Sequence, residues 1–174
     1  MITIRIATAG DLPEIHRVMR ASMEALGASF YDESQLRGAV RYISNPDHQL
    51  VDDGTYYVVA DDDRVVACGG WSRRRKLFTG TSEQEASTGD VDPSRDPARI
   101  RAMFVHPGYA RRGLGRLILE TSENHARRLG FTHFELMATL PGVPLYEACG
   151  YERVEDVTLE LPDGVRLDCV RMVK

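Results

Sequence analysis

Alternating apolar and polar positions predict strands near both ends of the chain. Residues 2–7 (ITIRIA) place Ile2, Ile4 and Ile6 on one face of a half-buried strand. Residues 157–173 contain two alternating segments around a Pro-Asp-Gly turn, which is a strong signal for a β-hairpin. The hairpin offers edge strands that a second copy of the chain could cover, so it is a candidate homodimer surface.

Longer apolar runs predict the centre of a sheet. Residues 55–60 (TYYVVA) and 64–71 (RVVACGGW) flank an acidic Asp-Asp-Asp turn and read as a hairpin of central strands. Within the second run, Gly69 and Gly70 indicate a β-bulge or the close approach of another backbone.

Apolar positions three and four residues apart predict two helices early in the chain. One follows a cap at Thr8 or Asp11 and runs to about Leu26. The second covers about residues 32–43, and its thin apolar face suits a mobile element. Tyr31, just before it, either packs at an edge or reaches into a binding site.

The predicted elements follow the order β-α-α-β-β-β-α-β-α-β-β, which mixes hairpins with one strand-helix-strand crossover. This order indicates an α/β fold with a mixed, mostly antiparallel central sheet flanked by helices. A chain of 174 residues has the length of one domain, and no shift in composition marks a boundary. Residues 1–174 are therefore expected to form a single domain.

The most informative stretch, residues 100–116 (IRAMFVHPGYARRGLGR), joins a strand to a helix through a basic loop. A Pro-Gly turn ends the strand, and the helix begins near Leu114 and ends at Gly130. Gly113 and Gly115 lack the Cβ atoms that would keep an anionic ligand away from the main chain. Because the first N–H groups of a helix have no intrahelical partner, such an end attracts phosphate.

Three arginines, Arg111, Arg112 and Arg116, add full charges to the partial positive charge of the helix dipole, which favours a diphosphate over a carboxylate. Nucleotide-binding turns and plain helix starts also use glycine, but the loop contains neither GxGxxG nor GxxxxGK[ST]. The loop therefore predicts a phosphate site, with a structural basic turn as the alternative.

The segments after this helix make the pattern specific. Residues 131–138 (FTHFELMA) predict another strand, and residues 145–151 (LYEACGY) predict a short helix closed by Gly150. The strand, the loop ARRGLG and LYEACGY, in this order, resemble the acetyl-coenzyme A segment of the GCN5-related N-acetyltransferase (GNAT) superfamily. The resemblance covers roughly residues 99–151 and implies acetyl-coenzyme A as the co-substrate.

The resemblance implies two sets of coenzyme-binding residues and one catalytic residue. The strand whose backbone would pair with the pantetheine arm contributes Met103, Phe104 and Val105. The loop and helix start that would hold the diphosphate contribute Arg111, Arg112, Gly113, Leu114, Gly115 and Arg116. Tyr146 falls where the family often keeps a tyrosine near the thioester sulfur.

Two positions depart from the family pattern. The loop begins with Ala110 where the family has Gln or Arg, so Arg111 or Arg112 must supply the missing side-chain contact. Thr139 stands where an asparagine is common.

Acetyl transfer to an amine sets requirements that the sequence meets only in part. An amine with a pKa of about 10.4 is only about one part in 2,500 neutral at pH 7, so a base or a water chain must take its proton. A distorted backbone N–H near Phe104 or Val105 could stabilise the oxyanion, and Tyr146 could protonate the departing thiolate. For the base, Glu135 and ordered water remain open. Cys149 reads as a structural thiol.

Composition excludes several classes of partner. The net charge of −4 argues against nucleic acid. Three cysteines without CxxC spacing and five histidines without ligand spacing indicate neither a disulfide framework nor a metal site. No leader pattern and no membrane-spanning apolar run is present, so a cytoplasmic protein without a membrane partner is expected.

Residues 72–97 lack periodicity and carry a basic run, RRRK at 73–76, followed by an acidic segment that includes Asp90 and Asp92. One interpretation is a lid whose acids draw in a cationic amine while the basic run faces the coenzyme phosphates. The other is a solvated insertion whose charges cancel.

These observations favour an acetyl-coenzyme A dependent N-acetyltransferase that moves an acetyl group to the primary amine of a small molecule by direct attack on the thioester. Two alternatives stay open. One is a non-catalytic acyl-coenzyme A sensor, which the missing base and Ala110 would suit. The other is a protein or peptide N-acetyltransferase.

Overall fold

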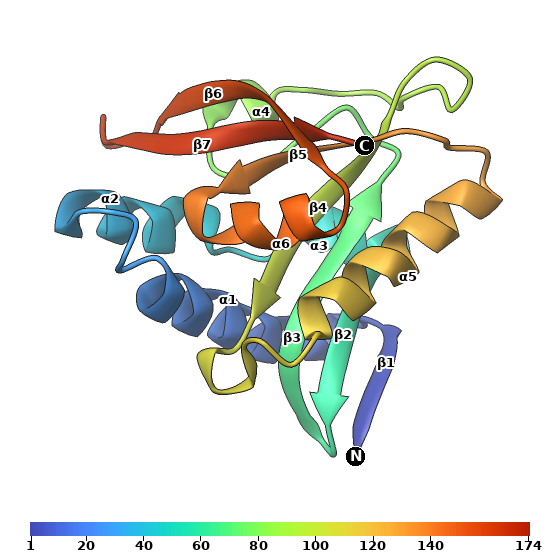
Figure 1. The fold of residues 1–174 in the computed structure, drawn as a ribbon, viewed down its shortest axis with the longest axis horizontal. Helices are drawn as coiled ribbons and strands as arrows, with labels where there is room; N and C mark the ends of the chain where they lie inside the picture. Colours follow the sequence, from blue (N-terminus) through green and yellow to red (C-terminus); the bar gives the residue numbers. More distant parts are fainter.

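The computed structural model describes all 174 residues and is built on a seven-stranded sheet in the order β1-β2-β3-β4-β5-β7-β6 (Figure 1). The strands are β1 Ile2–Ile6, β2 Tyr56–Asp61, β3 Arg64–Ser72, β4 Ala98–Val105, β5 Phe134–Thr139, β6 Glu152–Glu160 and β7 Arg166–Val173. Strands β4 and β5 are parallel, and every other neighbouring pair is antiparallel. The predicted mixed, mostly antiparallel sheet is confirmed.

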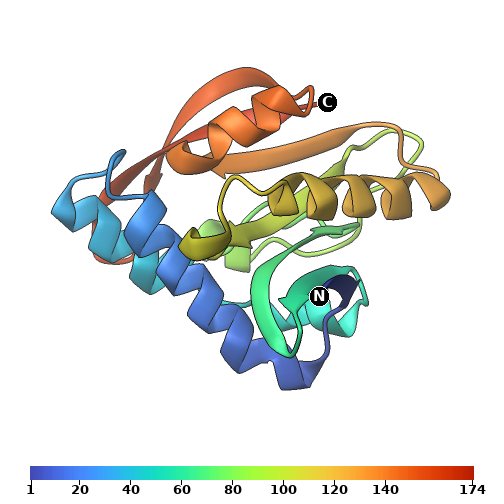
Figure 2. The ribbon, with the colours of Figure 1, turned by 60° about the horizontal axis from the view of Figure 1, so that its bottom comes forward.

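Helices cover both faces of this sheet (Figures 1 and 2). They are α1 Leu12–Leu26, α2 Glu33–Gly38, α3 His48–Asp52, α4 Ser82–Glu85, α5 Leu114–Arg128 and α6 Val143–Ala148. Helix α1 packs on Tyr56 and Val58 of β2, whereas α5 packs with Tyr57 and Val59, their neighbours in the strand. Because successive strand residues point to opposite faces, α1 and α5 lie on opposite sides of the sheet.

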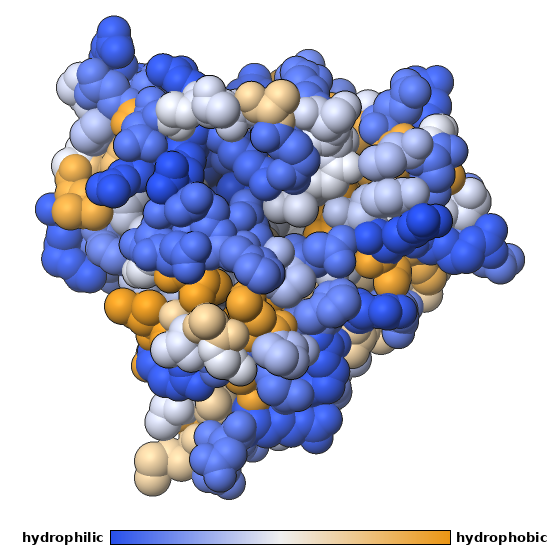
Figure 3. All heavy atoms as spheres, turned by 180° about the vertical axis from the view of Figure 1, so that it is seen from behind, coloured by the Kyte–Doolittle hydropathy of each residue, from blue (hydrophilic) through white to orange (hydrophobic).

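Further apolar side chains pack where the segment around α2 meets β7 and where α6 covers β5 and β7. The face of the molecule seen in Figure 3 is largely hydrophilic, and its hydrophobic side chains gather mainly below its centre. None of the helices has the length and hydrophobicity needed to cross a lipid bilayer.

Two predicted features at the N-terminal side need correction. Strand β1 is an edge strand in which Ile2 and Ile6 are 44% and 50% exposed, so the predicted buried face of three isoleucines is wrong. Only Ile4 packs against the core. The helix predicted over residues 32–43 ends at Gly38 and continues as a π-helical turn, Ala39–Ile43. The short helices α3 and α4 were not predicted.

The bulge predicted at Gly69 and Gly70 is confirmed. The register between β3 and β4 shifts between Cys68 and Gly70, and on β4 the residue Ala102 adopts a left-handed conformation with φ of 51°. A Cβ atom at Gly70 would collide with the backbone of Thr55 and Tyr56 at the start of the other neighbouring strand, so glycine is required there. The bulge bends β4 just before the residues predicted to contact the coenzyme.

Candidate active site

Strands β4 and β5 separate soon after they begin, which opens the centre of the sheet. They pair only at Ala98 with Phe134 and at Arg99 with Glu135. The bulge at Ala102 follows directly, and the Tyr56 hydroxyl donates a hydrogen bond of 2.6 Å to the Ala102 carbonyl oxygen. Beyond the bulge, β4 has no strand partner on its β5 side, so its backbone groups on that side are available to a ligand.

A cavity of about 550 Å³ extends from this opening to the start of α5. Met23 and Phe30, from α1 and the segment after it, form one wall, and α6 forms another. Eight of the predicted site residues line it: Met103, Phe104, Val105, Arg111, Gly113, Gly115, Arg116 and Tyr146. The end of β4 and the basic loop that follows it thus line one continuous cavity.

The start of α5 presents unpaired donors at one end of this cavity. The N-cap residue Gly113 has a φ of 81° and supplies no side-chain cap. The first intrahelical bond from this end joins the Leu117 N–H to the Gly113 carbonyl oxygen at 3.0 Å, so the three preceding N–H groups have no intrahelical acceptor. These donors and the helix dipole make an anion site of the kind that binds phosphate.

The three arginines of the loop differ in position. Arg111 and Arg116 line the cavity, and Arg116 also donates to the Ala148 carbonyl oxygen at 3.3 Å. Arg112 does not line the cavity, because its guanidinium stacks 4.9 Å from the centre of the Tyr109 ring. Arg111 is therefore the residue placed to replace the contact that is missing at Ala110.

Two other predicted residues have different roles from those expected. The side chain of Leu114 is buried against Ile118 and does not line the cavity, so only its backbone N–H faces the anion site. Gly115 also contributes to packing, since a Cβ atom there would lie 2.7 Å from a terminal methyl group of Leu145 in α6, which would have to move. Glycine at this position lets α6 approach α5 and close the cavity wall.

Tyr146 lies where the large cavity meets a second one. The smaller cavity has a volume of about 60 Å³, and the two share four lining residues: Met103, Phe104, Thr139 and Tyr146. The Tyr146 side chain is buried, and its ring packs edge-to-face on Tyr151 with a centroid distance of 5.8 Å. Burial raises the pKa of Tyr146, so the phenol stays protonated at neutral pH and remains a proton donor.

The remaining walls of the small cavity come from segments far apart in the sequence. They include Ile43 and Asn45 after the second helix and Leu77, Phe78 and Thr79 from the loop after β3. Its only charged lining residue is Arg101 of β4. Sequence reasoning missed Arg101, although a single charge inside the apolar strand IRAMFV was a usable signal.

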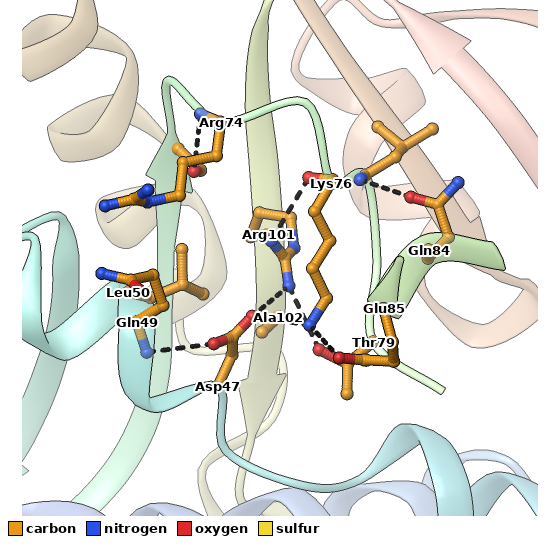
Figure 4. Close-up of polar contacts among 12 residues, drawn as sticks. Asp47, Gln49, Leu50, Arg74, Lys76, Thr79, Gln84, Glu85, Arg101 and Ala102 are labelled. Atoms are coloured by element: carbon orange, nitrogen blue, oxygen red, sulfur yellow. Dashed lines mark hydrogen bonds and ion pairs between the residues drawn. The ribbon is translucent and has the colours of Figure 1, made fainter. Parts of the chain in front are cut away.

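Arg101 belongs to a buried polar cluster that also contains Asp47, Lys76 and Thr79 (Figure 4). Its guanidinium donates to Asp47 at 2.9 Å, to the Thr79 hydroxyl at 3.1 Å and to the Lys76 carbonyl oxygen at 3.3 Å. The Lys76 ammonium pairs with Asp47 at 3.1 Å and with Glu85 at 2.8 Å. Burial opposes ionisation of Asp47, but Arg101 and Lys76 outweigh it and lower the pKa of that carboxyl.

The lid interpretation of residues 72–97 is wrong in its charges. No acid lines either cavity, and of this segment only residues 77–79 reach one. The basic run does not face the anion site, because Arg74 pairs with Asp53 at 2.7 Å and Lys76 with Asp47. Five of the ten charged residues of the segment, Arg74, Lys76, Glu85, Asp92 and Arg95, form ion pairs, and Arg74 and Lys76 pair with Asp53 and Asp47 outside it, so the alternative of self-cancelling charge is confirmed only in part.

Other candidates for the chemistry have structural roles. Glu135 lies between Arg99 and Arg171, at 2.7 and 3.1 Å, and lines neither cavity, so it is not placed to act as a base. Cys149 is half-buried against the core, and burial raises the pKa of its thiol, which disfavours a nucleophilic thiolate. No group of three or more His, Cys, Asp or Glu side chains is arranged to hold a metal ion.

Tyr31 packs at an edge and lines neither cavity. Its hydroxyl donates to the Asp168 carbonyl oxygen at 2.7 Å and accepts from the Leu140 N–H at 2.9 Å. These bonds tie the segment before α2 to strand β7 and to the segment that follows β5, so the role of Tyr31 is structural.

Solved structures share this architecture. A GCN5-related N-acetyltransferase (Aminotransferase, Class-II) from Rhodopseudomonas palustris superposes with a TM-score of 0.74 at 19% identity, covering 99% of this chain and 94% of that one. PaiA N-acetyltransferase from Thermoplasma acidophilum in complex with coenzyme A gives a TM-score of 0.68 at 14% identity, over 100% and 98% of the two chains. The ribosomal-protein-S18-alanine N-acetyltransferase from Escherichia coli gives 0.59 at 19% identity, over 99% and 92%.

At these identities the structural likeness shows the fold alone, and no curated protein matches the sequence. The family model "Acetyltransferase (GNAT) family" matches residues 15–151, which is most of the chain and includes both the basic loop and Tyr146. Fold similarity alone does not assign a family, but this match does. It shows that the chain belongs to the GNAT family, whose members transfer an acetyl group from acetyl-coenzyme A.

Proposed function

We propose that the protein is an N-acetyltransferase that moves the acetyl group of acetyl-coenzyme A to the primary amine of a small molecule. The observation that carries this proposal is the meeting of the two cavities at Tyr146. The large cavity leads from an anion site to Tyr146, and the small cavity ends at the same residue. An amine held in the small cavity is therefore next to a thioester held in the large one.

The residues assigned to the coenzyme follow from this arrangement. The N–H groups at the start of α5, with Arg111 and Arg116, would hold the diphosphate. The unpaired backbone of β4 at residues 103–105 would bind the pantetheine arm. The reacting end would then lie at Tyr146, where the two cavities meet.

The reaction requires an attack, an oxyanion donor and a proton for the leaving group. The amine nitrogen forms a bond to the thioester carbonyl carbon, and the carbon–sulfur bond breaks. Backbone N–H groups of β4 after the bulge at Ala102 are placed to stabilise the oxyanion. The Tyr146 phenol gives its proton to the departing thiolate, and it regains one from solvent.

The amine proton leaves through water in this proposal. No Asp, Glu or His lines either cavity, so no side chain there can act as the base. Ordered water with a backbone carbonyl oxygen is the remaining path. The same observation favours a second candidate function, a sensor that binds acyl-coenzyme A without catalysis.

The size of the small cavity favours a small acceptor over a peptide. At about 60 Å³ it holds a group of a few heavy atoms, whereas a peptide acceptor would need an open groove. The proposal that the acceptor is a small amine therefore rests on the size of this cavity and not on the substrate of any similar protein.

Mass spectrometry of a pooled reaction tests the function. The protein is incubated with acetyl-coenzyme A and amino acids, polyamines, aminoglycosides and short peptides, while free thiol release is followed. An acetylated small amine supports the proposal, and an acetylated peptide alone would replace it with a peptide N-acetyltransferase. Tight coenzyme binding by calorimetry without any product would support the sensor.

A further inference from the structure

The charged residues that line the two cavities are all arginines. Arg111 and Arg116 line the large cavity at the anion site, and Arg101 lines the small one. No carboxylate lines either space, so nothing in the walls complements a second positive charge on an acceptor. A polyamine or another dication would face only repulsion in the small cavity.

Arg101 is buried but not saturated with hydrogen bonds. The residue is 3% exposed, and its guanidinium carries five N–H donors, of which three are paired, with Asp47, Thr79 and Lys76. The Nε–H and one Nη1–H find no partner in the protein. A ligand group in the small cavity that accepts from these donors would complete the hydrogen bonds of Arg101.

The least exposed charges around Arg101 are two cations and one anion. The side chains of Lys76, Asp47 and Arg101 are 17%, 11% and 2% exposed. A second anion, Glu85, pairs with Lys76 at 2.8 Å, but it is 51% exposed and solvent partly screens its charge. The cluster is thus balanced only with the help of a partly screened carboxylate.

We propose that Arg101 binds a carboxylate of the acceptor, which makes the acceptor class a small amine that also carries a carboxylate. The Nε–H and the remaining Nη1–H of Arg101 point in different directions, so each can donate one charge-assisted hydrogen bond to a carboxylate oxygen. Ile43, Leu77, Phe78 and Met137 complete an apolar wall, which suits an acceptor with an apolar body. This inference rests on the proposed function, since it names the substrate of that same site.

Matched pairs of acceptors test the inference directly. Each pair consists of an amino acid and the same amine without its carboxylate: methionine with 3-methylthiopropylamine, leucine with isoamylamine, and 5-aminopentanoate with butylamine. We expect kcat/KM to be at least tenfold higher for the carboxylate member of at least one pair. Equal or reversed preference in every pair would leave acetyl transfer established and overturn the role of Arg101, whereas no acetylation of any amine would overturn both.

A variant separates recognition from simple anchoring of the loop. Arg101→Gln combined with Asp47→Asn removes both charges of the pair and leaves Lys76 paired with Glu85, which avoids an uncompensated charge at Arg101. We expect the kcat/KM ratio between the two members of the preferred pair to fall at least tenfold. If Arg101 only anchors residues 76–85, both members lose activity together and the ratio stays constant, which contradicts the proposal.

Two further variants keep this test decisive. Arg74→Gln removes a cation of the same loop that pairs with Asp53 and lines neither cavity, so it should leave the ratio unchanged. Should the double variant fail to fold, Arg101→Lys keeps the charge but loses the free Nε–H and Nη1–H donors, and it should still lower the ratio. An unchanged ratio in a folded Arg101→Lys protein, confirmed by unaltered coenzyme A affinity in calorimetry, counts against carboxylate binding.

Discussion

The two walls that meet at Tyr146 are built in different ways. The wall proposed to bind the coenzyme, called here the coenzyme wall, uses the backbone of one continuous stretch, the end of β4 and the loop to α5. The wall proposed to bind the acceptor, called here the acceptor wall, uses side chains from separate segments, and Arg101 pairs with Asp47 across 54 residues of sequence. A backbone site tolerates many side chains, whereas a side-chain site changes with each substitution.

This difference explains why the co-substrate can be assigned from the sequence but the acceptor cannot. Every GNAT acetyltransferase must bind the same co-substrate, so a local backbone motif is sufficient for that wall. The acceptor differs between enzymes, and its wall here depends on long-range ion pairs in a partly buried cluster. Perturbing each wall in turn should therefore give separate effects on stability, catalysis and coenzyme affinity.

The largest effect is expected from breaking the buried ion pair of the acceptor wall. Asp47→Asn leaves Arg101 and Lys76 without their shared anion, and removal of one partner of a buried pair costs about 3 kcal/mol of unfolding free energy. Urea denaturation measures this loss. Adding Arg101→Gln should restore at least half of it, and a double variant less stable than the single one would contradict the pairing.

The same pair predicts a dependence of stability on pH. The folded-state pKa of Asp47 is lowered, so its contribution to stability is complete above the ordinary carboxyl pKa of about 3.9 and is lost as pH falls through the folded value. Thermal melts between pH 7 and pH 2 should show a shallower acid decline for the Asp47→Asn, Arg101→Gln double variant than for the natural chain. Parallel curves would show that Asp47 titrates normally.

At the meeting point of the walls, Tyr146→Phe should lower the turnover number at least tenfold, because the thiolate loses its proton donor. Coenzyme A affinity in calorimetry should change little, since the ring that lines the cavity is kept. Unchanged turnover in this variant would remove Tyr146 from the mechanism.

In the coenzyme wall, Arg111→Ala combined with Arg116→Ala should weaken coenzyme A binding about tenfold, as expected for the loss of two partly exposed charged contacts. Arg112→Ala is the matched control, because Arg112 stacks on Tyr109 and does not line the cavity. Its effect on the Kd should stay below about twofold. Equal losses in the control and the double variant would indicate a general effect of positive charge.

The smallest effect is expected from the acidic part of the loop after β3. Asp90→Asn and Asp92→Asn should leave the KM for any amine within about twofold, because neither residue lines a cavity and exposed charges are screened. An increase in KM confined to cationic amines would restore the lid interpretation.

Local chemistry explains which parts of the structure were predictable. The Pro-Asp-Gly hairpin, the Asp-Asp-Asp turn and the glycine-flanked start of α5 each depend on neighbouring residues, and all three are where they were predicted. The alternation in β1 was misleading, because an edge strand buries little of either face and Ile2 and Ile6 remain exposed. Periodicity shows which residues share a face but not whether anything covers it.

The unpredicted parts of the site depend on tertiary contacts. The left-handed conformation of Ala102 is held by the bulge and by Tyr56, which lies 46 residues away in sequence. Tyr56 sits in an apolar run and reads only as core. The separation of β4 from β5 has no sequence signal of its own, because it follows from this bulge.

A crystal structure of the protein with coenzyme A bound tests the central claim most directly. We expect the diphosphate on the free N–H groups at the start of α5, beside Arg111 and Arg116, and the thiol sulfur within hydrogen-bonding reach of the Tyr146 hydroxyl. A coenzyme whose sulfur lies away from the junction of the two cavities, or whose diphosphate lies elsewhere, would contradict the account.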